Sequence, residues 1–151
     1  MGPTTRQRIS PALRGSVRGV VAAMAMTGMR HVTTGFGYLP PHSPPEAVLY
    51  HLATPVLKKF TQGQARALIE LLHWSYGSVG GALFGLLPRR WRRKHWIGPA
   101  YGFLFWLIFE TVIAPRLGET RWQSVPTRLA LIGDHVLYGA VVAASAWPHA
   151  D

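Results

Sequence analysis

Four long apolar stretches, joined by more polar connections, constrain this chain more than any other feature. An α-helix rises 1.5 Å per residue, so about 20 mostly apolar residues cross the roughly 30 Å hydrocarbon layer of a membrane. Such stretches lie at about residues 17–36, 67–87, 97–114 and 129–147. The pattern predicts an all-α fold, a four-helix transmembrane bundle that forms a single integral membrane domain over residues 1–151.

The composition excludes several other classes of protein. Charged residues make up 15% of the chain, against about 25% in an average soluble protein. The chain contains no cysteine, which excludes disulfide frameworks, thiolate catalysis and cysteine-ligated zinc. A formal net charge of +10 would indicate nucleic-acid binding on a soluble domain. Here the basic residues flank the apolar stretches, as they do in membrane proteins, so we expect no nucleic-acid partner.

A basic connection at residues 88–96 sets the expected orientation. The N-terminal tail is also basic, and with four spans both regions lie on the same side. The positive-inside rule makes that side the cytoplasm. The prediction is a multi-pass protein of the cytoplasmic (inner) membrane with both termini cytoplasmic. Its expected partners are membrane lipids, whose anionic headgroups would meet Arg89, Arg90, Arg92, Arg93 and Lys94.

The first stretch has a second interpretation, as a signal peptide. Arg6 and Arg8 lie ahead of it, and Ala23-Met24-Ala25 has small residues at the spacing of a cleavage site. Against this, Arg18 interrupts the start of the apolar stretch, and cleavage would leave only three spans. We therefore favour a retained helix.

The long connection at about residues 37–66 predicts a short amphipathic external helix. Ser43-Pro44-Pro45-Glu46 has the form of a helix start, with a capping serine, an early proline and a glutamate that closes a capping box. Pro55 predicts a bend. The helix either lies on the outer membrane surface or packs over the bundle as a lid. The apolar residues at helical spacing are Val48, Leu49, Leu52, Val56 and Phe60.

Small residues four positions apart recur on all four stretches. Lipid tails are as apolar as leucine, so membrane helices associate through close packing, which small residues permit. The first stretch carries Gly15, Gly19, Ala23 and Thr27 in this pattern. The glycines expected at helix contacts on the other three are Gly77, Gly81, Gly85, Gly98, Gly102 and Gly139.

Two stretches also share a motif. His73-x-x-Tyr76-Gly77 matches His135-x-x-Tyr138-Gly139, which a duplicated two-helix hairpin and chance similarity both explain. Together with Gly81-Ala82-Leu83-Phe84-Gly85 and Tyr101-Gly102, these motifs resemble an uncharacterised family of small four-span membrane proteins common in actinobacteria. The resemblance covers the second to fourth stretches and implies a four-helix membrane protein. It brings no activity, cofactor or catalytic residue with it.

Ionisable and polar residues gather near the outer ends of the stretches. Counted at 1.5 Å per residue, they lie roughly 5–10 Å below the outer surface. His31, His73 and His135 each lie four residues, about one helical turn, outward from Thr27, Gly77 and Gly139, and we expect this to turn them toward the bundle. The candidates for this polar layer are Arg30, His31, Glu70, His73, Tyr76, Glu110, Asp134, His135 and Tyr138.

Three roles fit the polar layer. The first is a structural network with Arg30 as the counter-charge, because unpaired charges in hydrocarbon are costly. The second is a transition-metal site with Glu70, His73, Glu110, Asp134 and His135 as candidate ligands. Asp134 and His135 are adjacent, however, and so point about 100° apart. The third role is the handling of protons or small solutes.

No nucleophile motif or phosphate-binding loop accompanies this layer, so we expect neither a catalytic residue nor a required cofactor. The favoured function is that of a non-enzymatic accessory or assembly subunit, as a homo-oligomer or within a larger membrane complex. The alternative is a protein that binds a metal or handles protons or small solutes through the polar layer.

Overall fold

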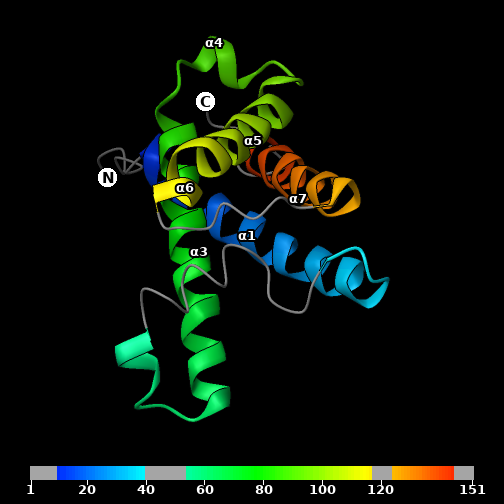
Figure 1. Ribbon diagram of the computed structural model, residues 1–151. Helices are drawn as coiled ribbons and strands as arrows, with labels where there is room; N and C mark the ends of the chain where they lie inside the picture. The colour runs from blue at the N-terminus through cyan, green and yellow to red at the C-terminus, as the bar shows by residue number, and fades with distance from the viewer. Residues whose placement is uncertain (1–9, 40–53, 117–123, 145–151) are drawn as a thin grey trace, which may run out of the picture.

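The computed structural model describes residues 10–39, 54–116 and 124–144, and every regular element in these ranges is helical. The all-α prediction is confirmed for this part of the chain. The elements are α1 (Pro11–Gly35), a helical turn at 54–57, α3 (Gln62–Leu86), α4 (Arg89–Arg92), α5 (Ile97–Ile108), the π-helical η1 (Phe109–Ile113), α6 (Ala114–Arg116) and α7 (Val125–Ala143). Figure 1 shows α3 crossed by α1, with α5 and α7 beside them.

Each predicted stretch contains one long helix, with shifted ends. α1, α3 and α7 begin before their apolar stretches, because polar residues set the starts. Ser10 and Ser124 accept hydrogen bonds from the Leu13 and Thr127 amides, and Thr61 forms a capping box with Gln64. Among the described residues, one helix is long and apolar enough to cross a membrane, the continuous Ile97–Arg116.

A π-helical segment lies inside that continuous helix. Pro115 has no amide hydrogen, and its ring would collide with the carbonyl group of Thr111 in a regular α-helix. The preceding turn is widened instead, and the Ala114 amide bonds to the Phe109 carbonyl five residues back. Proline thus explains the position of η1, which contains Glu110.

Glycines bring α1 and α3 into backbone contact. A Cβ atom added at Gly15 would collide with the carbonyl oxygen of Gly81, and one at Gly19 with that of Gly77. Gly85 lies against Pro11 and Ala12. The start of α1 therefore packs against the end of α3, and the two helices are antiparallel.

A second glycine contact joins α5 to α7. A Cβ atom at Gly98 would stand 2.5 Å from the Ala143 Cβ atom and 2.6 Å from the Gly139 oxygen. One at Gly102 would collide with the His135 carbonyl oxygen. This pair is antiparallel as well, so the start of α5 and the end of α7 meet. α1 also packs against α7.

Because the helix pairs are antiparallel, several helix ends lie together at one end of the molecule. The start of α1, the end of α3, the basic turn α4 and the start of α5 lie at one end of the molecule, in the upper part of Figure 1. The opposite end holds a small apolar cluster of Leu39, Trp106 and Leu131. Thr127 at the start of α7 donates a hydrogen bond to the Tyr38 carbonyl there, at 3.3 Å.

The structure describes only part of the external segment. Residues 40–53, with Ser43, Glu46 and the first apolar positions of the expected amphipathic helix, lie outside the described residues. The described residues 54–57, which include Pro55, are helical. Leu57 is buried against Ala65 and Ile69 of α3, while the predicted apolar positions Val56 and Phe60 are 51% and 44% exposed.

Candidate functional site: a buried polar layer

Five ionisable residues on three helices occupy neighbouring positions inside the structure. Arg30 on α1 is 9% exposed, Asp134 on α7 is fully buried and His135 is 7% exposed. Glu70 and His73 on α3 have side chains that are 23% and 11% exposed. We call these five residues the buried layer.

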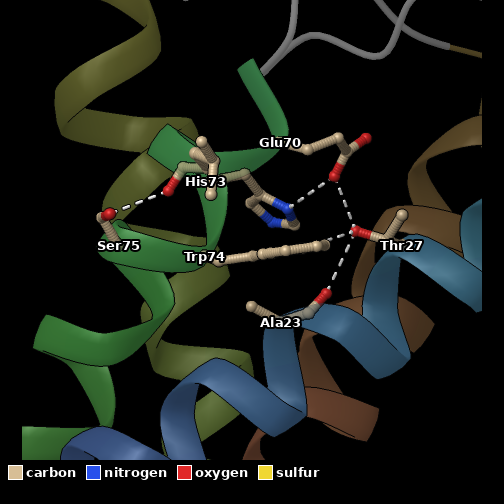
Figure 2. Close-up of polar contacts among 7 residues, drawn as sticks. Ala23, Thr27, Glu70, His73, Trp74 and Ser75 are labelled. Carbon is tan, nitrogen blue, oxygen red and sulfur yellow. Dashed lines mark hydrogen bonds and ion pairs between the residues drawn. The ribbon is translucent and has the colours of Figure 1, made fainter. Parts of the chain in front are cut away.

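A hydrogen-bonded group joins α1 to α3 at one side of the buried layer (Figure 2). The Thr27 hydroxyl lies 3.0 Å from a Glu70 carboxylate oxygen and 3.2 Å from the Ala23 carbonyl, so its single proton is shared between two acceptors. The Trp74 indole donates to the same hydroxyl oxygen at 3.4 Å. His73 Nδ1 lies 3.9 Å from Glu70 Oε2, an electrostatic contact longer than a hydrogen bond. Thr27 of α1 therefore holds the Glu70 side chain of α3 by a hydrogen bond.

The α7 side of the layer is bonded very differently. His135 Nδ1 lies 2.8 Å from the Leu131 carbonyl, which can only accept, so Nδ1 carries the proton. Neither carboxylate oxygen of Asp134 has a hydrogen-bond partner in the part of the chain that the structure describes. Buried polar groups almost always find partners, which makes Asp134 an exception that calls for an explanation.

Arg30 connects the two sides of the layer. Its guanidinium group lies within electrostatic range of His73, Asp134 and His135. His73 and His135 also lie within range of each other. The layer is thus one electrostatic unit contributed by α1, α3 and α7.

Four other predicted members lie elsewhere. His31 is exposed, which corrects the expectation that it turns toward the bundle. Glu110 is half-buried within η1. Tyr76 is 42% exposed, and the buried Tyr138 bonds to the glycine contact and not to the layer.

The metal-site hypothesis has no support in these positions. Among the described residues, no group of three or more histidine, aspartate or glutamate side chains is placed to hold a metal ion. The five candidate ligands, Glu70, His73, Glu110, Asp134 and His135, are therefore not gathered as that hypothesis requires. Asp134 and His135 are adjacent in the sequence and so point in different directions, which is consistent with this result.

Two tyrosine hydroxyls donate hydrogen bonds to glycine carbonyls at the helix contacts. The sequence did not indicate these bonds. Tyr138 donates to the Gly77 carbonyl and Tyr101 to the Gly80 carbonyl, both at 2.6 Å. A Cβ atom at Gly80 would stand 2.6 Å from the Tyr138 hydroxyl, so glycine is needed for the tyrosine to approach. Phe105 stacks between the Tyr101 and Tyr138 rings, with centroids 5.8 Å from each.

The basic turn at α4 is open to solvent. Arg89, Arg90 and Arg93 are exposed, and Arg92 donates through Nε to the Leu87 carbonyl at 3.0 Å. The Lys94 ammonium lies 5.9 Å from the centre of the Trp96 ring. Cations and exposed tryptophans therefore occupy the same end of the molecule.

Comparison with known proteins finds no family model, no curated protein and no solved structure that matches the chain. The resemblance to four-span actinobacterial proteins stays a prediction.

Proposed function

We propose that this chain is a four-span protein of the inner membrane that acts as a non-enzymatic assembly subunit. The observation that carries the proposal is the outward surface of the long helices, where each helix exposes large apolar side chains. Soluble monomers rarely expose large continuous apolar patches, whereas such side chains suit contact with lipid. Side chains with more than half of their surface exposed include Val17, Val21, Val79, Leu83, Leu104 and Leu129.

The polar groups are distributed in the opposite way. Arg30, Asp134 and His135 are buried between helices, while the cations of the α4 turn stand at one end. Trp91 and Trp96 beside them are 49% and 60% exposed, as in the aromatic belt of a membrane interface. This distribution supports four spans with the basic end in the cytoplasm, where anionic lipid headgroups meet the α4 turn.

Two unused glycines support assembly with a partner. Gly28 on α1 and Gly133 on α7 have no atom within 4 Å of the place where a Cβ atom would stand. Glycines on an outer helix face let another membrane helix approach closely. We therefore expect α1 and α7 to face a second copy of the chain or a helix of a larger membrane complex.

The test is the mass of the particle extracted directly from membranes in lipid nanodiscs. The expected mass exceeds that of one chain, and Gly28→Leu combined with Gly133→Leu lowers it while the melting temperature is kept. Gly63→Leu is the matched control, because Gly63 also faces open space but lies in the first turn of α3. A wild-type particle that contains a single chain and no other protein would contradict the assembly role.

A further inference from the structure

The burial of Asp134 is difficult to explain for a permanent anion. The side chain is 0% exposed, and neither oxygen has a hydrogen-bond partner among the described residues. A carboxylate in such a place loses its hydration and gains no hydrogen bond in return. The neutral carboxylic acid pays a much smaller cost, so the described arrangement suits the protonated form.

The ionisable groups of the buried layer come from three of the long helices. α1 contributes Arg30, a charge within electrostatic range that favours the anion. α3 contributes His73, which lies within electrostatic range of Arg30 and His135, and the partly exposed Glu70, whose Oε2 atom lies 3.9 Å from His73 Nδ1. On α7, His135 holds its Nδ1 proton on the Leu131 carbonyl. The facing part of α5, residues 102–108, has no ionisable residue.

We propose that Asp134 is a proton-binding site whose occupancy is coupled to the contact between α1 and α7. The carboxylate takes up one proton and becomes the neutral acid. When the proton leaves, the anion attracts the Arg30 guanidinium across that contact. The proton enters from the outer side through Glu70 and His73. The inference rests on the proposed membrane placement, because lipid around the helices keeps bulk water away from the layer.

Infrared spectroscopy tests the site directly. The full chain in lipid nanodiscs is titrated with acid while the C=O stretch of protonated carboxylic acids is recorded. We expect one band from a buried acid that disappears in Asp134→Asn. Asparagine preserves the size and neutrality of the acid, so this variant is expected to melt at the wild-type temperature. Glu110→Gln is the control and keeps the band. A band that survives in Asp134→Asn, or no band at any pH, overturns the proposal.

The entry route is tested by deuterium exchange of the same band. Glu70→Gln leaves the band in place and slows its shift in heavy water by about tenfold or more, because the proton donor at the entrance is lost. Unchanged exchange would overturn the route through Glu70. If the chain shows the band but does not insert into membranes, only the proposed membrane role is contradicted. An inserted chain without the band would contradict the proton site alone.

Discussion

The glycine contact between α1 and α3 and the buried layer are adjacent regions of the same helices, yet they are built differently. At the glycine contact, backbones touch, and the Tyr138 and Tyr101 hydroxyls each have a carbonyl partner. In the buried layer, Asp134 is equally buried and has no hydrogen bond among the described residues. Among the described residues, the first region has no buried polar side-chain atom without a hydrogen-bond partner, and it is suited to holding the fold. The second retains a group that stability alone does not require.

The largest expected effect is at the glycine contact. In Gly81→Leu the new side chain would meet the Gly15 carbonyl oxygen and, at 2.7 Å, the Gly19 Cα atom. Backbone cannot move aside cheaply, so we expect a loss of about 3 kcal/mol or more in the free energy of unfolding. Thermal unfolding in a mild detergent measures it.

The matched control is Gly28→Leu, which enters open space on α1 and changes the unfolding free energy by less than about 0.5 kcal/mol. Equal stability of the two variants would remove the distinction between glycines at helix contacts and glycines on outer faces.

A smaller loss of unfolding free energy is expected when Tyr138 is changed than when Gly81 is changed. Tyr138→Phe removes the donor to the Gly77 carbonyl and is expected to cost about 1 kcal/mol, the scale of an interhelical hydrogen bond in a membrane. Tyr76→Phe is the control, because this ring is 42% exposed and its hydroxyl has no such role. Chemical unfolding of both variants gives the difference. Similar values for the two would show that the interhelical bond contributes nothing.

A still smaller effect is expected in the buried layer. Asp134→Asn changes the unfolding free energy by less than about 0.5 kcal/mol, since the acid forms no hydrogen bond to lose. The same unfolding assay, run near neutral pH, compares it with Tyr138→Phe. A larger loss at Asp134 than at Tyr138 would reverse the contrast between the two regions.

Metal removal is expected to have no effect. A chelator should leave the melting temperature unchanged, because the described residues provide no three-ligand group. Elemental analysis of the purified protein is the accompanying measurement. A stoichiometric transition metal that is lost from the His73→Ala and His135→Ala double variant would contradict this expectation.

The sequence predicted the long helices well because their apolar length is a local property. The sequence also contains signals for the helix starts, because Thr61 and Gln64 have capping-box spacing and Ser10 precedes a proline. These starts were not predicted. The π-helical turn before Pro115 was missed for a different reason. Proline indicates a disturbed helix without indicating how the backbone accommodates it.

Five of the nine residues predicted for the polar layer lie near one another, and four face elsewhere. Depth follows from counting residues along a helix, so Arg30, His73 and Asp134 were expected at one level. Facing depends on which neighbour each helix packs against, and successive residues differ by about 100°. His31 is consequently exposed, and the partly exposed Tyr76 packs its ring on Phe105, with centroids 5.0 Å apart. The bond from Tyr101 to the Gly80 carbonyl depends on tertiary packing, which no local pattern indicates.

The most direct test of the account is the sidedness of the helix ends in sealed membrane vesicles. The chain has no cysteine, so single cysteines can be labelled with a membrane-impermeant maleimide against a clean background. Leu13→Cys and Arg90→Cys are predicted to react only from the cytoplasmic side, and Gly63→Cys and Val125→Cys only from the other. Reaction of Leu13→Cys and Arg90→Cys from opposite sides, or of all four from both sides, would contradict a four-span bundle with one basic end.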